Sequence, residues 1–236
     1  MSKPQLFCFT YAGGTASFFN GIAKDLPAVD LVALEYSGHG TRHDEALYDS
    51  FAELAEDMYQ MLRLSYQGGS YSLFGYSMGT ISLVEVLKRI VDQAEILLPD
   101  YVFLAAHEPR TKEELSGFSS GEMDDLVKER TIRFGGVPER LINNKIFWRT
   151  YLPLFRADYS IIGKYRFDEL NMVSQIPAVV FYSESDTRKN EMEQWKRFFV
   201  GECEFFQYEG NHFFIQEHHE KIAEIIRDRM ITRENK

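Results

Sequence analysis

The serine at position 77 has a glycine two residues before it and another two residues after it, in Gly-Tyr-Ser-Met-Gly at 75–79. Apolar residues 71–74 precede this pentapeptide with strand character, and residues with helical periodicity follow it. A serine on a very tight strand-to-helix turn needs small residues at these two positions, because larger side chains would collide with adjacent backbone. The pattern predicts a nucleophilic serine, with the N–H of Met78 facing a developing oxyanion at the helix N-terminus.

A serine hydroxyl is a poor nucleophile unless a base takes its proton and an acid orients the base. His212 is the candidate base, since it lies in a loop after the last apolar stretch and before the terminal helical stretch. That order matches α/β-hydrolases, in which the chain supplies serine, then Asp or Glu, then histidine. His39 and His43 precede the serine and remain alternative bases.

The other three histidines receive different predictions. His107 opens a long segment without strands and could touch a substrate without acting as the base. His218 and His219 fall inside the terminal amphipathic helix, so we expect them on the surface.

Asp186 is the favoured acid, because it lies in the loop that follows the apolar residues 178–182. An aspartate at this position could instead cap the following helical stretch, 188–199. Glu108, after the preceding strand, is the rival acid.

A second oxyanion donor is expected in the loop after the first strand. The sequence Thr-Tyr-Ala-Gly-Gly at 10–14 lets backbone approach a site closely, and the N–H of Ala12 is the candidate donor. The alternative is a glycine-rich turn that only leads into a helix at 17–26.

Short apolar stretches alternate along the chain with longer stretches of helical period. Strands are expected at 6–9, 31–34, 71–74, 101–104 and 178–182, with a further one at 203–208. The continuous apolarity of the first five is typical of strands that are covered on both faces. The alternation predicts an α/β fold with a mostly parallel, doubly wound sheet, and we expect a single domain over residues 1–236.

One segment, from about residue 110 to 167, breaks this alternation. It has helix-like pieces at 122–134 and 138–155 that are punctuated by glycines and by Pro153. We expect this insertion to form a lid over the carboxyl edge of the sheet. The alternative is additional helical packing without a role in binding.

Composition excludes several classes of protein. A formal net charge of −10 argues against nucleic-acid binding, which favours a concentrated basic face. We expect no signal peptide and no membrane span, and therefore a cytoplasmic location. Cys8 and Cys203 lie in apolar stretches without metal-ligand spacing, so neither a disulfide scaffold nor a metal site is expected.

Four segments together resemble the type II thioesterases that accompany nonribosomal peptide and polyketide synthetases, and the similarity runs nearly end to end. They are FTYAGGTASFF near the start, EYSGHGTR, FGYSMG, and FGGVPERLINN with YLPLFRADY in the expected lid. The resemblance implies an α/β-hydrolase fold, the triad Ser77, Asp186 and His212, and oxyanion amides at Ala12 and Met78.

Three positions depart from the usual pattern of that family. Tyr76 stands where a histidine is common, and Thr10 and Ser37 stand where prolines are common. None of these departures removes a group that the mechanism requires, so they bear on substrate preference.

The resemblance also implies a reaction, the hydrolysis of acyl groups stalled as thioesters on the phosphopantetheine arm of a carrier domain. No metal or redox cofactor would be needed, the partner would be an acyl or peptidyl carrier domain, and we expect a monomer. Apolar surface near the acyl group is expected from Phe147, Trp148, Leu152 and Phe155. Residues at such helical spacing can equally belong to the core.

Two alternative functions remain open on the sequence. A general carboxylesterase or acyl-coenzyme A thioesterase would share the triad, and a catalytically silent hydrolase fold could act as a binding module. Transient docking of a carrier domain through Arg42, Arg110 or Arg156 is a further hypothesis, because the protein and carrier domains are both acidic.

Overall fold

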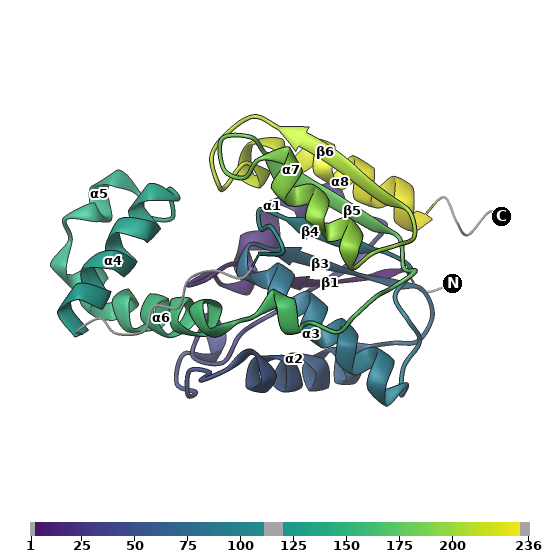
Figure 1. The fold of residues 1–236 in the computed structure, drawn as a ribbon, viewed down its shortest axis with the longest axis horizontal. Helices are drawn as coiled ribbons and strands as arrows, with labels where there is room; N and C mark the ends of the chain where they lie inside the picture. The colour runs from purple at the N-terminus through teal and green to yellow at the C-terminus, as the bar shows by residue number, and fades with distance from the viewer. Residues whose placement is uncertain (1–2, 111–119, 232–236) are drawn as a thin grey trace.

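A computed structural model describes residues 3–110 and 120–231. Within them, six parallel strands form one sheet in the order β2-β1-β3-β4-β5-β6 (Figure 1). The strands are β1 (Gln5–Phe9), β2 (Asp30–Leu34), β3 (Tyr71–Tyr76), β4 (Val102–Ala105), β5 (Ala178–Ser183) and β6 (Cys203–Tyr208). The predicted parallel sheet and the six strand positions are confirmed.

Helices cover both faces of the sheet. On one face, α1 (Asn20–Asp25) packs against α8 (Ile215–Ile231). On the other face lie α2 (Phe51–Ser65), α3 (Met78–Gln93) and the short α7 (Lys189–Met192). Because the helices lie on both faces, the fold is doubly wound, as predicted.

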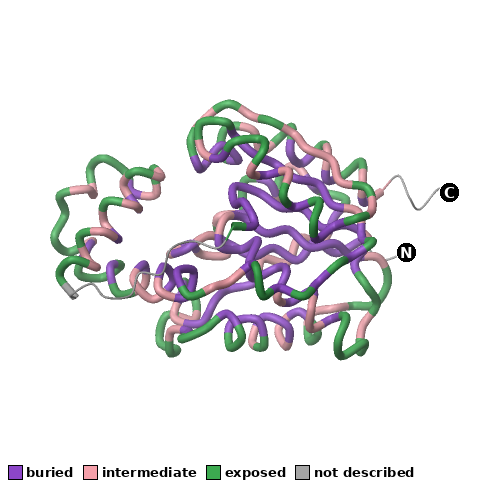
Figure 2. The backbone as a smooth tube through the Cα atoms, viewed as in Figure 1, coloured by how far each residue is buried: buried purple, intermediate pink, exposed green. Residues whose placement is uncertain are grey.

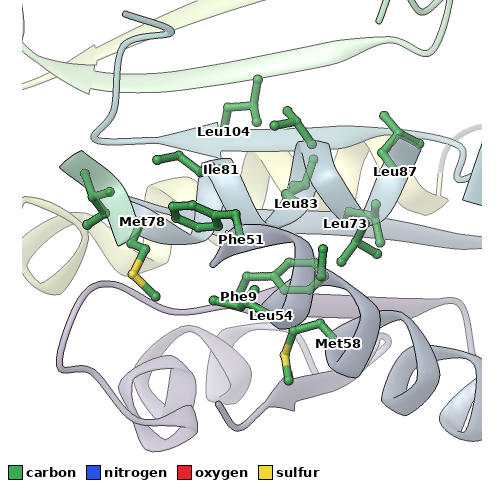
Figure 3. Close-up of a cluster of buried hydrophobic side chains, with 14 of the residues drawn as sticks. Phe9, Phe51, Leu54, Met58, Leu73, Met78, Ile81, Leu83, Leu87 and Leu104 are labelled. Carbon is green, nitrogen blue, oxygen red and sulfur yellow. The ribbon is translucent and has the colours of Figure 1, made fainter. Parts of the chain in front are cut away.

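Two hydrophobic clusters, one on each face, hold these layers together, and successive residues of β1 divide between them. Phe7 and Phe9 belong to the cluster beneath α2 and α3, and Leu6 and Cys8 to the cluster beneath α1 and α8. Figure 3 shows the first cluster, where Phe51 and Leu54 of α2 and Ile81 of α3 meet the sheet. The alternation follows from the pleat of a strand that is buried on both faces.

The two edge strands are less covered than the four central strands. Four of the five residues of β2 are half-buried, and β6 contains no fully buried residue. The prediction of coverage on both faces is therefore wrong for 31–34, because an edge strand has a neighbouring strand on one side only. Figure 2 shows the buried residues gathered in the middle of the sheet and the exposed residues on the outside of the surrounding helices.

A helical block lies between β4 and β5 in the chain, as expected, and projects to one side of the sheet (Figure 1). It consists of α4 (Ser120–Arg133), α5 (Glu139–Ile142) and α6 (Lys145–Lys164). Residues 111–119 of the expected insertion lie outside the described part of the chain. We call α4, α5 and α6 the helical block.

Helix boundaries in this block differ from the sequence-based expectation. The predicted helical piece 138–155 is interrupted after α5, and the side chain of Asn144 caps α6 by accepting hydrogen bonds from the N–H groups of Ile146 and Phe147. Pro153 lies inside α6 and does not end it.

The strand order places two of the predicted loops side by side. After β1 the chain moves outward to β2, and it then returns to β3 on the other side of β1. Ligands of open α/β sheets bind at the carboxyl ends of the strands where the order reverses in this way. The glycine-rich loop after β1 and the Ser77 turn after β3 therefore meet at one edge.

Candidate active site

The Ser77 turn has the strained geometry that the sequence predicts. Ser77 has φ 54° and ψ −118°, outside the regions that non-glycine residues normally occupy. A Cβ atom on Gly75 would lie 2.4 Å from the carbonyl oxygen of Gly79, and a Cβ atom on Gly79 would lie 2.0 Å from that of Phe9. Both glycines are needed because backbone approaches them directly.

Three side chains from distant loops form a continuous hydrogen-bonded chain. His212 Nε2 lies 2.8 Å from Ser77 Oγ, and His212 Nδ1 lies 2.8 Å from Asp186 Oδ2. An imidazole that donates from Nδ1 to the carboxylate can accept the serine proton at Nε2. The structure thus brings together the three residues that the sequence proposes as nucleophile, base and orienting acid.

The loop that carries His212 is held by two aromatic residues. Tyr76 donates its hydroxyl proton to the backbone carbonyl of His212 over 2.6 Å, and burial raises the pKa of that phenol well above its ordinary range. The Phe134 ring lies against the imidazole with a centroid separation of 4.6 Å. Tyr76, the departure from the usual family pattern, therefore positions the backbone of the candidate base.

The rival acid has other partners. Glu108 Oε2 accepts a hydrogen bond from Thr187 Oγ1 over 3.4 Å, and its Oε1 lies 3.1 Å from Arg110 Nη2. Only Asp186, of the two candidate acids, lies within hydrogen-bond distance of His212.

The alternative bases also have other partners. His39 is buried and interacts with Asp158, while His43 is exposed and contacts the Gly40 carbonyl. His218 and His219 are half-buried in α8, and His219 lies 2.6 Å from Asp25. His107 lines the cavity beside Ser77, where the sequence analysis allowed it to touch a substrate.

Both candidate oxyanion amides lie beside the serine. Met78 is the first residue of α3, so its N–H has no acceptor within the helix. Ala12 lines the same cavity as Ser77, and its N–H has no protein acceptor within the part of the chain described. Their role as oxyanion donors remains a prediction.

A cavity of about 580 Å³ adjoins the Ser77 hydroxyl. This volume lies within the range of small-molecule sites. Its apolar wall includes Tyr11, Phe134, Phe155, Tyr159, Ile162 and Phe213. Sequence reasoning missed five of these six, although Phe213 adjoins the predicted base and Phe134 precedes the Gly135-Gly136 pair.

The predicted acyl-pocket residues divide into two groups. Phe155 lines the cavity, whereas Phe147, Trp148 and Leu152 do not. Trp148 and Leu152 are buried in the hydrophobic cluster, Trp148 donates its indole N–H to the Ile142 carbonyl, and Phe147 stacks beside Tyr151. Of these three residues, Trp148 joins α6 to α5, and only Phe155 is retained as a candidate substrate contact.

The arginines considered for docking are all engaged in ion pairs. Arg42 contacts Glu45 and Asp57, Arg110 contacts Glu108 and Glu191, and Arg156 contacts Asp124.

Two other arginines, which no sequence motif marks, border the cavity. Arg130 and Arg133 of α4 form no ion pair with any residue in 3–110 or 120–231. The Arg133 guanidinium lies 5.5 Å from the centroid of the Phe134 ring, which itself packs on His212.

Within those same described ranges, no cluster of three or more His, Cys, Asp or Glu side chains could hold a metal ion. None of the described helices is long and apolar enough to cross a membrane. Cys8 and Cys203 are free cysteines, and burial raises the pKa of the Cys203 thiol to about 11.

Comparison with known proteins identifies the family. The family model of the thioesterase domain matches residues 4–230, so the chain belongs to the thioesterase family. The resemblance inferred from the sequence is confirmed at this level.

Relatives with known names cover nearly the whole chain. The chain is 26% identical to Thioesterase PikA5 of Streptomyces venezuelae over 98% of its own length and 82% of that protein's. It is 27% identical to Thioesterase TesA of Mycobacterium marinum, over 97% of this chain and 90% of that protein.

Solved structures agree with the fold and the family. ClbQ from the colibactin NRPS/PKS pathway superimposes with a TM-score of 0.86 at 25% identity, with 98% of each chain covered. The type II thioesterase BorB from the borrelidin biosynthetic cluster gives a TM-score of 0.81 at 28% identity, over 97% of this chain and 93% of BorB.

Proposed function

We propose that this chain is a type II editing thioesterase that hydrolyses aberrant or stalled acyl thioesters from the phosphopantetheine arms of carrier domains in nonribosomal peptide or polyketide biosynthesis. The observation that carries the proposal is the hydrogen-bonded chain Ser77–His212–Asp186 beside the cavity, in a member of the thioesterase family. Names such as type II thioesterase BorB support the choice of substrate.

In the first half of the proposed reaction, His212 Nε2 takes the Ser77 hydroxyl proton while Oγ attacks the thioester carbonyl. The negative charge that develops on the carbonyl oxygen is stabilised by the N–H groups of Ala12 and Met78. The C–S bond then breaks, and the carrier thiol leaves with the proton from His212. An acyl ester on Ser77 remains.

In the second half, water enters and gives a proton to His212 Nε2 as its oxygen attacks the acyl ester. Breakage of the ester bond returns that proton to Ser77 Oγ and releases the carboxylic acid. Throughout the cycle, the Asp186 carboxylate accepts from Nδ1–H and stabilises the imidazolium.

The helical block would form the entrance for the carrier's arm, since Phe155, Tyr159 and Ile162 of α6 line the cavity. Arg130 and Arg133 of α4 suit an anionic group on the substrate, because neither guanidinium is paired with a carboxylate in the described ranges. A phosphopantetheine thioester carries such a group, whereas a simple ester does not.

The proposal includes a monomeric, cytoplasmic enzyme in one domain that uses no cofactor of its own. The phosphopantetheine belongs to the partner carrier domain. Free cysteines at positions 8 and 203 are compatible with a reducing compartment.

The direct experiment offers purified protein a set of acylated carrier domains, acyl-coenzyme A thioesters and oxygen esters, with release followed by mass spectrometry. The proposal expects the highest kcat/KM for carrier-bound thioesters. Much faster cleavage of simple oxygen esters would favour a general carboxylesterase, and hydrolysis of none would favour a binding module.

A further inference from the structure

A buried carboxylate on the helical block reaches the glycine-rich loop after β1. Asp158 of α6 accepts a hydrogen bond from the Gly13 N–H over 2.6 Å, and the same oxygen, Oδ2, lies 3.0 Å from His39 Nε2. The side chains of His39 and Asp158 are 0% and 3% exposed. Asp158 therefore links α6, the loop after β2 and the candidate oxyanion loop at one buried point.

The partners of His39 define its protonation. Its Nδ1 lies 2.9 Å from the backbone carbonyl of Ser37, and its Nε2 faces the carboxylate of Asp158. Both partners are acceptors, so both ring nitrogens must carry a proton to satisfy them. His39 is therefore an imidazolium, and Asp158 is its counterion.

Packing by α6 adds to the hydrogen bond on Gly13. Gly13 has φ +76°, and a Cβ atom there would lie 2.0 Å from the Phe155 ring. Phe155 and Asp158 are three residues apart in α6 and so lie on one face of the helix. On that face, the Phe155 ring packs against Gly13 and the Asp158 carboxylate accepts a hydrogen bond from its N–H.

The loop is anchored on its other side as well. The Glu35 carboxylate accepts hydrogen bonds from the N–H groups of Ala16 and Thr41, over 2.8 and 3.3 Å. The other titratable groups around the His39–Asp158 pair are Glu35, Tyr36 and Tyr159. The centroid of the Tyr36 ring lies 5.6 Å from that of His39. The loop is thus held at Gly13 and Ala16 on the C-terminal side of Ala12, and by the end of β1 at Phe9 on the N-terminal side.

We infer that Asp158, held in place by protonated His39, is a positioning residue for the oxyanion loop. The packing of α6 against Gly13 then controls how well the Ala12 N–H stabilises the transition state. By accepting from the Gly13 N–H, the carboxylate sets the peptide geometry that leaves the adjacent Ala12 N–H free for the substrate oxygen. This inference rests on the proposed function.

Three variants test the inference. Asp158→Ala removes both hydrogen bonds, Asp158→Asn keeps an oxygen acceptor but removes the charge, and Asp124→Asn is the control. Asp124 of α4 pairs with Arg156 of α6, the helix that carries Asp158, and has no contact with residues 11–16 among its interactions with the described residues. The control therefore measures the effect of loosening the helical block alone.

The expected result is a loss in kcat of about 100-fold for Asp158→Ala, the size associated with loss of one oxyanion donor, with KM changed less than threefold. Asp158→Asn should lose less, and Asp124→Asn should stay within about threefold of the wild type. Hydrogen exchange at the amides of 11–16 should accelerate in both Asp158 variants and remain at the wild-type rate in the control.

A pH profile adds a readout that a loss of stability would not produce. In the wild type, deprotonation of His39 should lower kcat at alkaline pH. His39→Gln keeps a neutral donor toward Asp158, so the kcat of this variant should not fall at alkaline pH. The inference is overturned if both Asp158 variants match the control in kcat and in exchange at Gly13. Failure of the wild type to cleave thioesters would instead refute the proposed function, because the exchange measurement needs no substrate.

Discussion

At the residue scale, mutation can test which of the two candidate carboxylates orients the base His212. Asp186 accepts from His212 Nδ1, whereas Glu108 is occupied by Thr187 and Arg110. We predict that Asp186→Asn lowers kcat by about 10⁴-fold, since an amide favours the wrong imidazole tautomer.

Glu108→Gln is the matched control for this prediction. It changes a second buried carboxylate on the same cavity, and we expect a loss of less than about tenfold because that side chain does not orient the base. Steady-state kinetics on one thioester measures both variants. An equal loss in the two variants would contradict the assignment of Asp186.

The three triad residues could be proposed from the sequence because each lies in a local pattern whose chemistry constrains it. Gly75 and Gly79 mark the serine turn, and His212 lies in a short loop between a strand and a helix. The partners of Asp158 could not be found in this way, since 145 residues separate it from Gly13 and no local pattern joins them.

At the element scale, the close approach of α3 to the end of β1 explains why position 79 is glycine. A Cβ atom there would meet the Phe9 carbonyl at 2.0 Å, and backbone on both sides leaves no flexible group to move aside. We predict that Gly79→Ala destabilises the protein by more than about 3 kcal/mol, as expected for overpacking against backbone.

Gly21→Ala is the control for this substitution, because nothing lies within 4 Å of its Cβ position in α1. That change should stabilise the fold by about 0.5–1 kcal/mol through better helix propensity. Urea denaturation measures both variants. A Gly79→Ala protein as stable as the wild type would show that the turn can shift without cost.

Helix α4 carries a prediction about substrate charge. Replacing Arg130 and Arg133 together by Gln should lower kcat/KM by about 10-fold or more for phosphopantetheine thioesters, since a charge-assisted hydrogen bond contributes about 1.5–3 kcal/mol. A neutral acyl ester should be cleaved at the wild-type rate, because it has no anionic group for these side chains to contact.

The source of the anion is tested with the same double variant. Acyl-pantetheine, which lacks the phosphate, should react equally with the wild type and the variant. A similar loss on the neutral ester and on both thioesters would mean that the arginines maintain the helical block and do not contact the substrate.

Sequence periodicity identified the helical block but not the orientation of its side chains. Phe147, Trp148, Leu152 and Phe155 share a helical spacing, yet only Phe155 faces the cavity. The direction that each side chain takes depends on how α6 packs against α4 and the sheet, and tertiary contacts of that kind leave no local signature.

At the scale of the whole molecule, the order of the strands places the site. All six strands were expected from their apolar residues. The reversal of order between β1 and β3 explains why residues 12 and 77 can meet at one edge, and His212 reaches the same edge because it follows the carboxyl end of the parallel strand β6. The partial exposure of β2 was missed because a short apolar stretch looks the same in an edge strand and in a central strand.

The His39–Asp158 pair also gives global stability a pH dependence. Burial alone would lower the pKa of His39, but the hydrogen bond and charge of Asp158 and the Ser37 carbonyl together raise it above its ordinary value of 6.5. A histidine whose folded pKa is raised stabilises the protein fully below its unfolded pKa, and this contribution is lost as pH rises through the folded pKa.

We therefore predict that the wild type exceeds His39→Gln in unfolding free energy most strongly below pH 6.5, and that the difference shrinks as the pH increases. Urea titrations over a series of pH values measure it. His43→Gln, which removes an exposed imidazole, should give a curve parallel to that of the wild type. A difference that grows with pH would mean that His39 is neutral in the folded protein.

The proposed mechanism requires Ser77 to form a covalent acyl ester during thioester hydrolysis, and rapid-quench mass spectrometry of the protein mixed with an acylated carrier domain can detect that ester. We predict a transient mass increase equal to the acyl group on the peptide that contains Ser77, with neither adduct nor acid release from Ser77→Ala. Hydrolysis by Ser77→Ala at the wild-type rate would contradict it.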